Sequence, residues 1–405
     1  MRPRHDAPRP ADAARAGVRW LLAQAALGFP DAVHVMRFPR AGGLLPGTVE
    51  HRGASFAQAV LGALLLDVAD ALPSSDAASA AGLRAAAARL ADAVAQARLP
   101  ALAGGWRYFP GLAALPPDLD SLAVALSLFA RVAPEHLTAC EPALALALAQ
   151  QQPEGPVPTW LIGAQDPLLQ RWWMRLGVRH GWGDTIDVDV CARFASALDL
   201  LHTPQASEAA ARLAAWVAQQ QRPDGRWPAS WYAGDAVAAG LALAAVAAVD
   251  HDGERRARTA AHLLGTQRMD GGWGPFDDSA PLDTAVAVAL LRHAPQADTA
   301  RARGLAYLCD RQTLAGGWKA TPWIRMDIGR AQGRVARIAT WGCAAISTAA
   351  CVRTLLQVSA ADAAQASEVT WMTPPPVGKP PCGCAGRRHA GRGCKGCRGC
   401  KEAAA

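Results

Sequence analysis

Apolar positions follow helical spacing along most of the chain, and stretches with the alternating pattern of a β-strand are almost absent. This pattern predicts twelve helices separated by Gly-, Pro- and Asp-rich joins, with bounds 12–27, 54–72, 77–98, 119–131, 136–151, 188–202, 206–221, 235–248, 254–267, 282–293, 298–312 and 341–357. Short polar joins alternate with longer loops, so the helices form six antiparallel pairs when the last helix pairs with the first. Six such pairs close into an all-α barrel that has one helix of each pair inside and one outside.

A short motif recurs in the longer loops: a glutamine, three residues, a glycine, one residue and a tryptophan. Its three clear copies are about 45 residues apart, which is the length of two helices and their turns. Glycine permits a tight turn at positive φ, tryptophan can cover a helix end, and glutamine can bond to backbone groups at a helix terminus. We therefore assign the repeat tryptophans Trp227, Trp273 and Trp318 to stability rather than to chemistry.

The charge of the chain is concentrated at its C-terminal end. The 405 residues carry a net charge of +7, but the segment from Lys379 onward holds seven basic residues and one acid, Glu402, which leaves the rest at +1 (7 − 6). A nearly neutral body excludes the clustered basic face that nucleic acids require. No apolar run reaches the roughly 18–20 residues of a membrane span, and the first residues lack a signal peptide. We expect a cytoplasmic protein, and contact with the inner membrane through an apolar patch stays open.

The helical pattern stops after residue 357. We therefore divide the chain into a helical domain at 12–357, a Pro-rich linker at 358–381 and a basic, disordered tail at 382–405. The tail is rich in cysteine and includes a C-x2-C-x2-C run, a spacing that fits a zinc or iron–sulfur site. The alternative is a disordered basic tail that binds metal only opportunistically. The candidate ligands are Cys382, Cys384, Cys394, Cys397 and Cys400.

Two segments carry a family resemblance. Residues 221–234, QRPDGRWPASWYAG, resemble the glutamine–tryptophan (QW) repeat of the terpene cyclases, and residues 104–126, GGWRYFPGLAALPPDLDSLAVAL, resemble the stretch that carries their DxDD signature. Over roughly residues 12–357 the chain is similar to the α/α-toroid superfamily of squalene–hopene cyclases, other class II terpene cyclases and protein prenyltransferase β subunits. The resemblance implies a single α/α toroid with six inner and six outer helices. It also implies an isomerase that cyclises an isoprenoid small molecule and requires no cofactor.

By this resemblance Asp120 aligns with the proton donor of DxDD and Asp118 with the first aspartate, while Ser121 replaces the last aspartate. An alkene is a very weak base, so its protonation needs a strong acid in a dry pocket. Two close carboxylates can share a proton, and a helix N-terminus favours the conjugate base that is left behind. The alternative is that either aspartate simply caps a helix.

Further candidates lie near the same mouth of the predicted barrel. Acidic residues at the starts of other inner helices would make that mouth acidic, and aromatic faces would stabilise a cationic intermediate. The substrate-binding candidates are Tyr108, Phe109, Asp187, Asp189, Trp231, Asp283, Trp323 and Trp341.

Two other functions fit the sequence. One is a non-catalytic toroid that binds a lipid or a protein partner. The other is a zinc-dependent, prenyltransferase-like protein, because Asp189-Val190-Cys191 has the spacing of that family's Asp-x-Cys ligands. Its third ligand should come from a later inner helix, but His293 lies at the end of its helix and the last inner helix has Cys343 and no histidine. Squalene–hopene cyclases place their active site between two barrels, whereas this chain has material for one. It therefore acts on a smaller isoprenoid, uses a partner chain to complete the site, or has lost catalysis.

Overall fold

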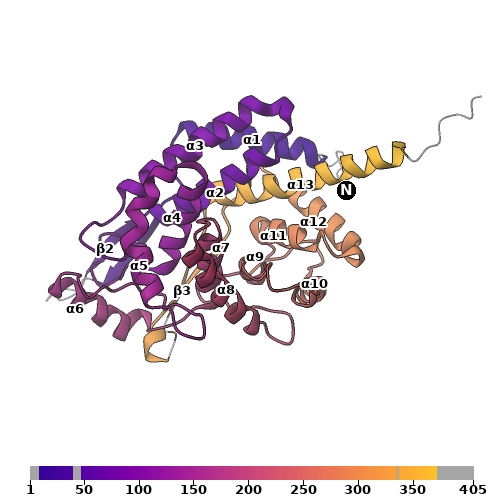
Figure 1. Cartoon of the computed structure of the whole chain (residues 1–405). Helices are drawn as coiled ribbons and strands as arrows, with labels where there is room; N and C mark the ends of the chain where they lie inside the picture. Colours follow the sequence, from indigo (N-terminus) through magenta and orange to yellow (C-terminus); the bar gives the residue numbers. More distant parts are fainter. Residues whose placement is uncertain (1–8, 40–46, 334, 336, 372–405) are drawn as a thin grey trace, which may run out of the picture. The chain divides into compact units, whose positions relative to one another are not determined.

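The computed structural model describes residues 9–39, 47–333, 335 and 337–371. These residues form thirteen α-helices and four short strands (Figure 1). The described residues up to Ser359 belong to one compact unit. No helix within the described ranges is long and apolar enough to cross a membrane.

Six helices form an inner ring. Their buried faces extend around most of the helix, as in α4, where every residue from Leu119 to Leu126 is buried. The ring consists of α2 (Ser55–Ala71), α4 (Leu119–Val132), α7 (Val188–Asp199), α9 (Asp235–Ala245), α11 (Pro281–Leu291) and α13 (Ala344–Trp371). It closes through α13, where Arg353 pairs with Asp67 of α2 at 2.9 Å and the Thr354 hydroxyl donates to Ala285 O of α11 at 3.0 Å.

Six outer helices are amphipathic or partly exposed: α1 (Pro10–Ala26), α3 (Ala77–Gln96), α5 (Glu141–Ala149), α8 (Pro204–Gln219), α10 (Glu254–Thr266) and α12 (Asp298–Arg311). The predicted toroid of six inner and six outer helices is therefore confirmed, and all twelve predicted helices are present. The last one begins at Ala344 and runs to Trp371, past its predicted end at residue 357.

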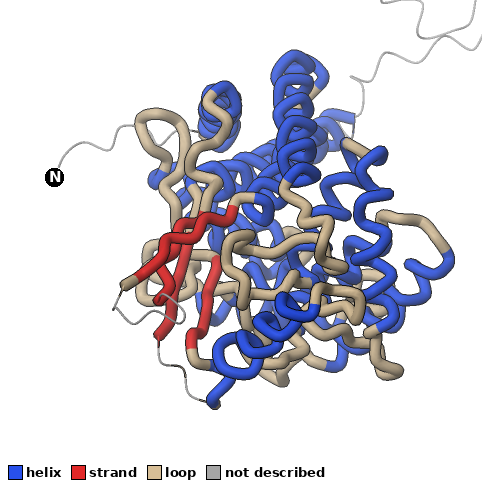
Figure 2. The backbone as a smooth tube through the Cα atoms, turned by 90° about the vertical axis from the view of Figure 1, so that its left-hand side faces the viewer, coloured by secondary structure: helices blue, strands red, loops and turns tan. Residues whose placement is uncertain are grey.

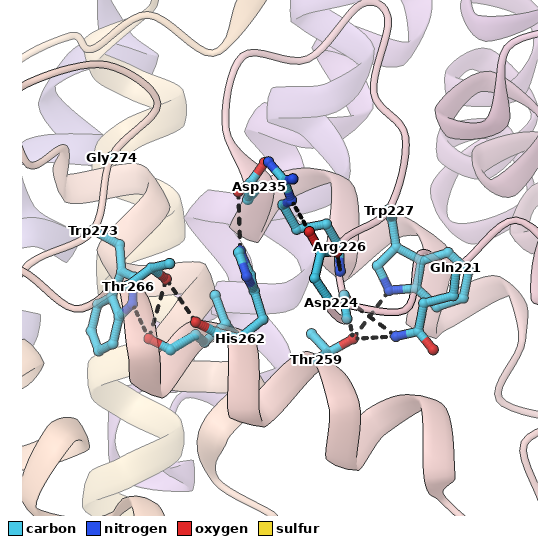
Figure 3. A network of polar contacts seen from close by, with 12 residues as sticks. Gln221, Asp224, Arg226, Trp227, Asp235, Thr259, His262, Thr266, Trp273 and Gly274 are labelled. Atoms are coloured by element: carbon cyan, nitrogen blue, oxygen red, sulfur yellow. Dashed lines mark hydrogen bonds and ion pairs between the residues drawn. The ribbon is translucent and has the colours of Figure 1, made fainter.

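The glutamine–tryptophan repeat fastens each pair to the next. Gln221 Nε2 donates to Gly225 O at 3.2 Å and to Arg255 O of α10 at 2.9 Å, and the Trp227 indole donates to the Thr259 hydroxyl at 3.1 Å (Figure 3). Gly225 has a φ of +86°, as expected for a turn that requires glycine. Glutamines 267 and 312 make the same two kinds of bond. The last copy closes the outer ring, because Gln312 Nε2 reaches Ala13 O of α1 at 2.8 Å.

The helices are accompanied by two short hairpins that the sequence pattern did not predict. β1 (His34–Pro39) pairs antiparallel with β2 (Thr48–Gly53), and β3 (Ile324–Ile328) pairs antiparallel with β4 (Arg337–Trp341). The two hairpins lie on the same side of the helices (Figure 2). There His34 of β1 stacks on Trp341 of β4. A further helix, α6 (Leu168–Gly177), was also missed.

Candidate functional site

Asp118 is the N-cap of α4. Its backbone is extended, and its carboxylate accepts hydrogen bonds from Ser121 N at 2.6 Å and Ser121 Oγ at 2.9 Å. The capping interpretation therefore holds for this residue. Burial raises the pKa of Asp118 to about 7, and the nearby Asp120 carboxylate adds to the effect while the bonds from Ser121 oppose it. Asp118 consequently fixes the first turn of the helix that carries Asp120.

Asp120 lies inside that first turn and is held by two residues from other elements. Its Oδ2 accepts from the Tyr232 hydroxyl at 2.6 Å, and Arg193 Nε lies 3.1 Å from its Oδ1. The same Nε donates to the Tyr232 oxygen at 3.0 Å, so Oδ1 accepts no hydrogen bond within the described residues. Burial raises the pKa of Asp120, whereas Arg193 and Tyr232 oppose that rise. The side chain can thus hold a proton, and its conjugate base has two stabilising partners.

Both carboxylate oxygens of Asp187, at the start of α7, accept hydrogen bonds. Its Oδ2 accepts from the hydroxyls of Thr159 and Thr185 and from the Trp231 indole, each at 2.8 Å, and Arg330 pairs with its other oxygen. Burial alone would favour the neutral acid, but Arg330 and these donors lower the pKa of Asp187 below its ordinary value. Asp187 is therefore an ionised anchor.

Asp189 is two residues further along the same helix. Its Oδ2 accepts from the backbone N–H groups of Ser230 at 2.7 Å and Trp231 at 2.8 Å. Burial, together with the charge of Asp187, raises the pKa of Asp189 to about 7. This residue ties the loop before α9 to α7 and so positions Trp231 and the adjacent Tyr232.

A narrow cavity lies beside these carboxylates, and six of its thirteen lining residues are aromatic. Trp160 packs edge-on against Trp231 at a centroid distance of 5.6 Å and lies 6.4 Å from Trp182. The lining residues are Phe56, Tyr108, Phe109, Leu115, Asp118, Asp120, Thr159, Trp160, Trp182, Val190, Trp231, Ile324 and Met326. The cavity therefore combines a buried carboxylic acid with aromatic faces that can stabilise a cation.

The structure gathers some of the predicted site residues and separates others. Tyr108, Phe109, Asp118, Asp120 and Trp231 line the cavity, and Asp187 and Asp189 contact it through Trp231.

The remaining three predicted site residues lie elsewhere. Trp323 lines a different cavity of about 440 Å³ inside the inner ring. Trp341 stacks on His34 and lies tilted against Trp323. Asp283 lies in a third pocket, beside Arg268 and Asp235. The expected ring of carboxylates is thus divided between two places.

Sequence reasoning missed the two residues that hold Asp120. Arg193 is a charged residue within an apolar inner helix, one turn after Asp189, and that position was an available signal. Tyr232 directly follows Trp231 in a segment already singled out. Phe56, Trp160 and Trp182 also line the cavity and were missed, because nothing local in the sequence marks them.

The zinc interpretation gains no support from the arrangement around α7. The Cys191 thiol donates to Val157 O at 3.4 Å, and burial raises its pKa to about 12, so it stays protonated. The described parts of the chain contain no group of three or more His, Cys, Asp or Glu side chains placed to hold a metal ion. The five cysteines proposed as tail ligands lie outside the described residues.

A closed α/α barrel with a buried carboxylic acid beside an aromatic cavity defines the toroid cyclase class of proteins. Residues 90–326 match the family model of the squalene-hopene cyclase C-terminal domain, and the chain belongs to that family. The sequence resemblance is confirmed on this point.

Relatives and solved structures extend the match. Drimenyl diphosphate synthase from Streptomyces showdoensis is 34% identical over 245 residues, which cover 58% of this chain and 41% of that protein. Copalyl diphosphate synthase from Streptomyces anulatus is 38% identical over 108 residues, covering 24% and 19%. The type II terpene cyclase MstE from Scytonema has the same fold, with a TM-score of 0.62 at 19% identity over 87% of this chain and 98% of that one. The chain thus spans less than half the length of the curated relatives it matches.

Proposed function

We propose that this chain is a class II terpene cyclase that starts the cyclisation of an isoprenoid by protonating an alkene, with Asp120 as the general acid and Asp118 as its partner. One observation carries the proposal. Of the four carboxylates at or beside the cavity, those of Asp118, Asp187 and Asp189 are engaged as a cap, an ion pair and a loop tie. Asp120 alone has an oxygen, Oδ1, that accepts no hydrogen bond from the described residues, and its side chain lines the cavity.

The proposed chemistry follows from this geometry. Protonated Asp120 gives its proton to one carbon of the alkene, and the Tyr232 hydroxyl and Arg193 stabilise the carboxylate that forms. The resulting tertiary cation lies among Phe56, Trp160 and Trp231, whose ring faces stabilise positive charge while the chain folds and closes. Asp118 caps α4 and so fixes the position of Asp120. When Asp118 is protonated, it places no second negative charge beside the Asp120 carboxylate.

The comparisons support an isoprenoid substrate. Two relatives are named for the synthesis of drimenyl and copalyl diphosphates, and structures of MstE variants hold geranylgeranyl dihydroxybenzoate as substrate and merosterolic acid A as product. MstE matches this fold over nearly its whole length, which supports the view that one barrel can suffice for such a reaction. We infer that a linear prenyl chain is the substrate here as well and that no cofactor is required.

The test is incubation of the purified full-length chain with squalene, farnesyl diphosphate and geranylgeranyl diphosphate, with products analysed by mass spectrometry. We expect a cyclic isomer from at least one of them, and incorporation of one deuterium when the reaction runs in D2O. Asp120→Asn should lower the rate by roughly 10²- to 10⁴-fold, the usual contribution of a general acid. The matched control is Asp283→Asn, another buried aspartate at an inner helix start, which should leave the rate unchanged. The assignment fails if no substrate turns over or if Asp120→Asn retains full activity.

The tail, the membrane and a partner chain enter the proposal separately. We infer that Cys382, Cys384, Cys394, Cys397 and Cys400 could bind zinc or an iron–sulfur cluster without taking part in cyclisation. Metal analysis of the full-length protein against a variant with all five cysteines changed to serine tests this, and equal metal content would exclude a tail site.

Peripheral contact with the inner membrane can be tested by vesicle sedimentation. A requirement for a partner chain would appear as activity restored only by a cell extract.

A further inference from the structure

An open groove of about 580 Å³ lies beside α6, at the edge of the helical unit (Figure 1). Its walls come from α6 with the proline before it, and from two segments that precede α4, residues 99–102 and 107–113. The groove shares no lining residue with the cavity beside Asp120. Nine of its eleven lining residues are apolar, among them Leu102, Leu169 and Trp173. Its volume lies within the roughly 300–1,000 Å³ that is usual for a small-molecule site.

The exceptional residue in this apolar wall is Arg107. It is only 4% exposed, and its one hydrogen bond within the described residues runs from Nη1 to Pro110 O at 3.1 Å. Its Nε and Nη2 have no partner among those residues. The buried Asp166 carboxylate is engaged elsewhere, because its oxygens accept from Ala103 N and Gly163 N, each at 2.7 Å. Burial lowers the pKa of Arg107 to about 10 and Asp166 opposes that fall, so the guanidinium is charged at neutral pH.

The charges around the groove indicate what would pair with this guanidinium. A buried charge without a partner is costly, so we expect the partner of Arg107 to come from outside the chain. Residues 98–117 and 167–183 include every lining residue of the groove, and they contain five arginines and no carboxylate. The groove therefore favours an anion, and the fork of a guanidinium matches the paired oxygens of a carboxylate or a phosphate. The five arginines are Arg98, Arg107, Arg171, Arg175 and Arg179.

The apolar surface of α6 indicates that the anion carries an apolar chain. Leu168, Leu169 and Trp172 are 74%, 71% and 54% exposed, and Leu169 also lines the groove. A lipid bilayer would meet these protruding side chains, but it would not reach a guanidinium that is nearly enclosed by the groove. A single molecule with an anionic head and an apolar chain satisfies both features, because the head reaches Arg107 while the chain covers apolar surface.

We propose that this groove binds one amphiphile, whose carboxylate or phosphate head pairs with Arg107 and whose apolar chain lies against Leu169 and Trp173. The ligand class is thus a single-chain carboxylic acid or a phosphate ester. This second site is separate from the cavity that holds Asp120, and it does not depend on the proposed cyclase function.

The test is isothermal titration calorimetry of the full-length protein with dodecanoate and with dodecyl phosphate, below the concentrations at which they form micelles. We expect one bound molecule per chain. Dodecanol and inorganic phosphate, which supply only the chain or only the head, should bind at least about tenfold more weakly. Equal affinity for dodecanol would refute the pairing with Arg107.

Two arginine variants sharpen the calorimetry. Arg107→Met removes the charge and keeps an apolar side chain of similar length, and it should weaken the binding of both anions roughly 10- to 100-fold. Arg179→Met is the matched control, because Arg179 belongs to the same basic segment but is exposed and does not line the groove. The control should bind both anions as the wild type does. Wild-type affinity in a folded Arg107→Met protein would overturn the proposal.

Photocrosslinking of the wild type keeps the proposal falsifiable if Arg107→Met folds poorly. A dodecanoate analogue with a photoreactive diazirine should label residues 99–113 or α6, and excess dodecyl phosphate should prevent the labelling. Labelling confined to other segments would contradict the proposal. Sedimentation with phosphatidylglycerol vesicles separates the two sources of an anionic head. If the protein binds such vesicles but no monomeric amphiphile, the groove faces a membrane and the proposal is wrong.

Discussion

Replacing Tyr232 by phenylalanine removes one hydroxyl group from the buried network around Asp120. The lost contacts are the donated bond to Asp120 Oδ2 at 2.6 Å and the bond accepted from Arg193 Nε at 3.0 Å. The ring itself is retained, so its packing against Trp323 at a centroid distance of 5.8 Å should persist. The change therefore removes the hydroxyl's bond to the proposed acid together with its bond to Arg193 and leaves the ring in place.

The size of the effect can be worked from that bond. A hydrogen bond to a charged group contributes about 1.5–3 kcal/mol, and in the proposed reaction the negative charge on Asp120 develops as the proton leaves. Loss of the bond should slow turnover roughly 10- to 100-fold, since about 1.4 kcal/mol corresponds to a factor of ten. Because the hydroxyl opposes the rise in the pKa of Asp120, its removal should also raise that pKa further.

The assay is the pH dependence of single-turnover cyclisation by the wild type, Tyr232→Phe and the control Tyr307→Phe. Tyr307 is the matched control because its hydroxyl donates to Ser279 O and does not line the cavity. An acid works only while it is protonated, so activity disappears as the pH rises through the pKa of Asp120. Tyr232→Phe should be slower at its plateau and should lose activity at a higher pH than the wild type. An unchanged plateau, or a loss of activity that moves to lower pH, would refute the role assigned to this hydroxyl.

Two further predictions concern stability. Gln312→Ala removes the bond to Gly316 O and the bond to Ala13 O that closes the outer ring, and should lower the free energy of unfolding in urea by about 1–3 kcal/mol. The half-buried Gln170, which donates one bond to Ala113 O, is the control, and Gln170→Ala should have little effect. Equal stabilities would contradict the closure role. Burial raises the pKa of Asp283 from 3.8 to about 7, so the folded state holds this proton more tightly and the wild type loses stability as the pH rises from 4 to 7. Asp283→Asn removes that loss. Its free energy of unfolding relative to that of the wild type should rise by up to roughly 4 kcal/mol between pH 4 and pH 8. Parallel pH–stability curves for the two proteins would contradict this prediction.

The fold could be predicted because its determinants are local and repeated. The spacing of Gln221, Gln267 and Gln312 gave both the period and the register, and helical periodicity supplied the helices between them. The hairpins escaped because their strands are only five or six residues long. β3 (IRMDI) alternates apolar and polar residues, but five residues are a weak signal, and β1, β2 and β4 do not alternate. α6 escaped for a related reason, since its Leu168, Leu169 and Trp172 are exposed instead of forming a buried stripe.

The candidate site was only partly predictable, because its essential pairs join distant positions. A proline followed by aspartate marks a helix start, which located Asp118 and Asp120. Tyr232 lies 112 residues from Asp120, and His34 lies 74 residues from Tyr108. No local pattern reports such contacts. They follow from ring closure, which is a property of the whole barrel.

Ring closure also explains how this chain can bury the carboxylates of the proposed site. Taking four carboxylates out of water is costly, and each cost is met differently: a helix cap for Asp118, an arginine for Asp187, backbone N–H groups for Asp189, and the Arg193–Tyr232 pair for Asp120. The donors for Asp120 come from α7 and from the loop before α9, while the cavity wall draws on α2 and β3 as well. A helix pair by itself could not supply this set. The acid therefore depends on contacts between successive repeats. A mutation at Gln312 that loosens the ring should disturb the hydrogen bonds around Asp120, although Gln312 makes none of them.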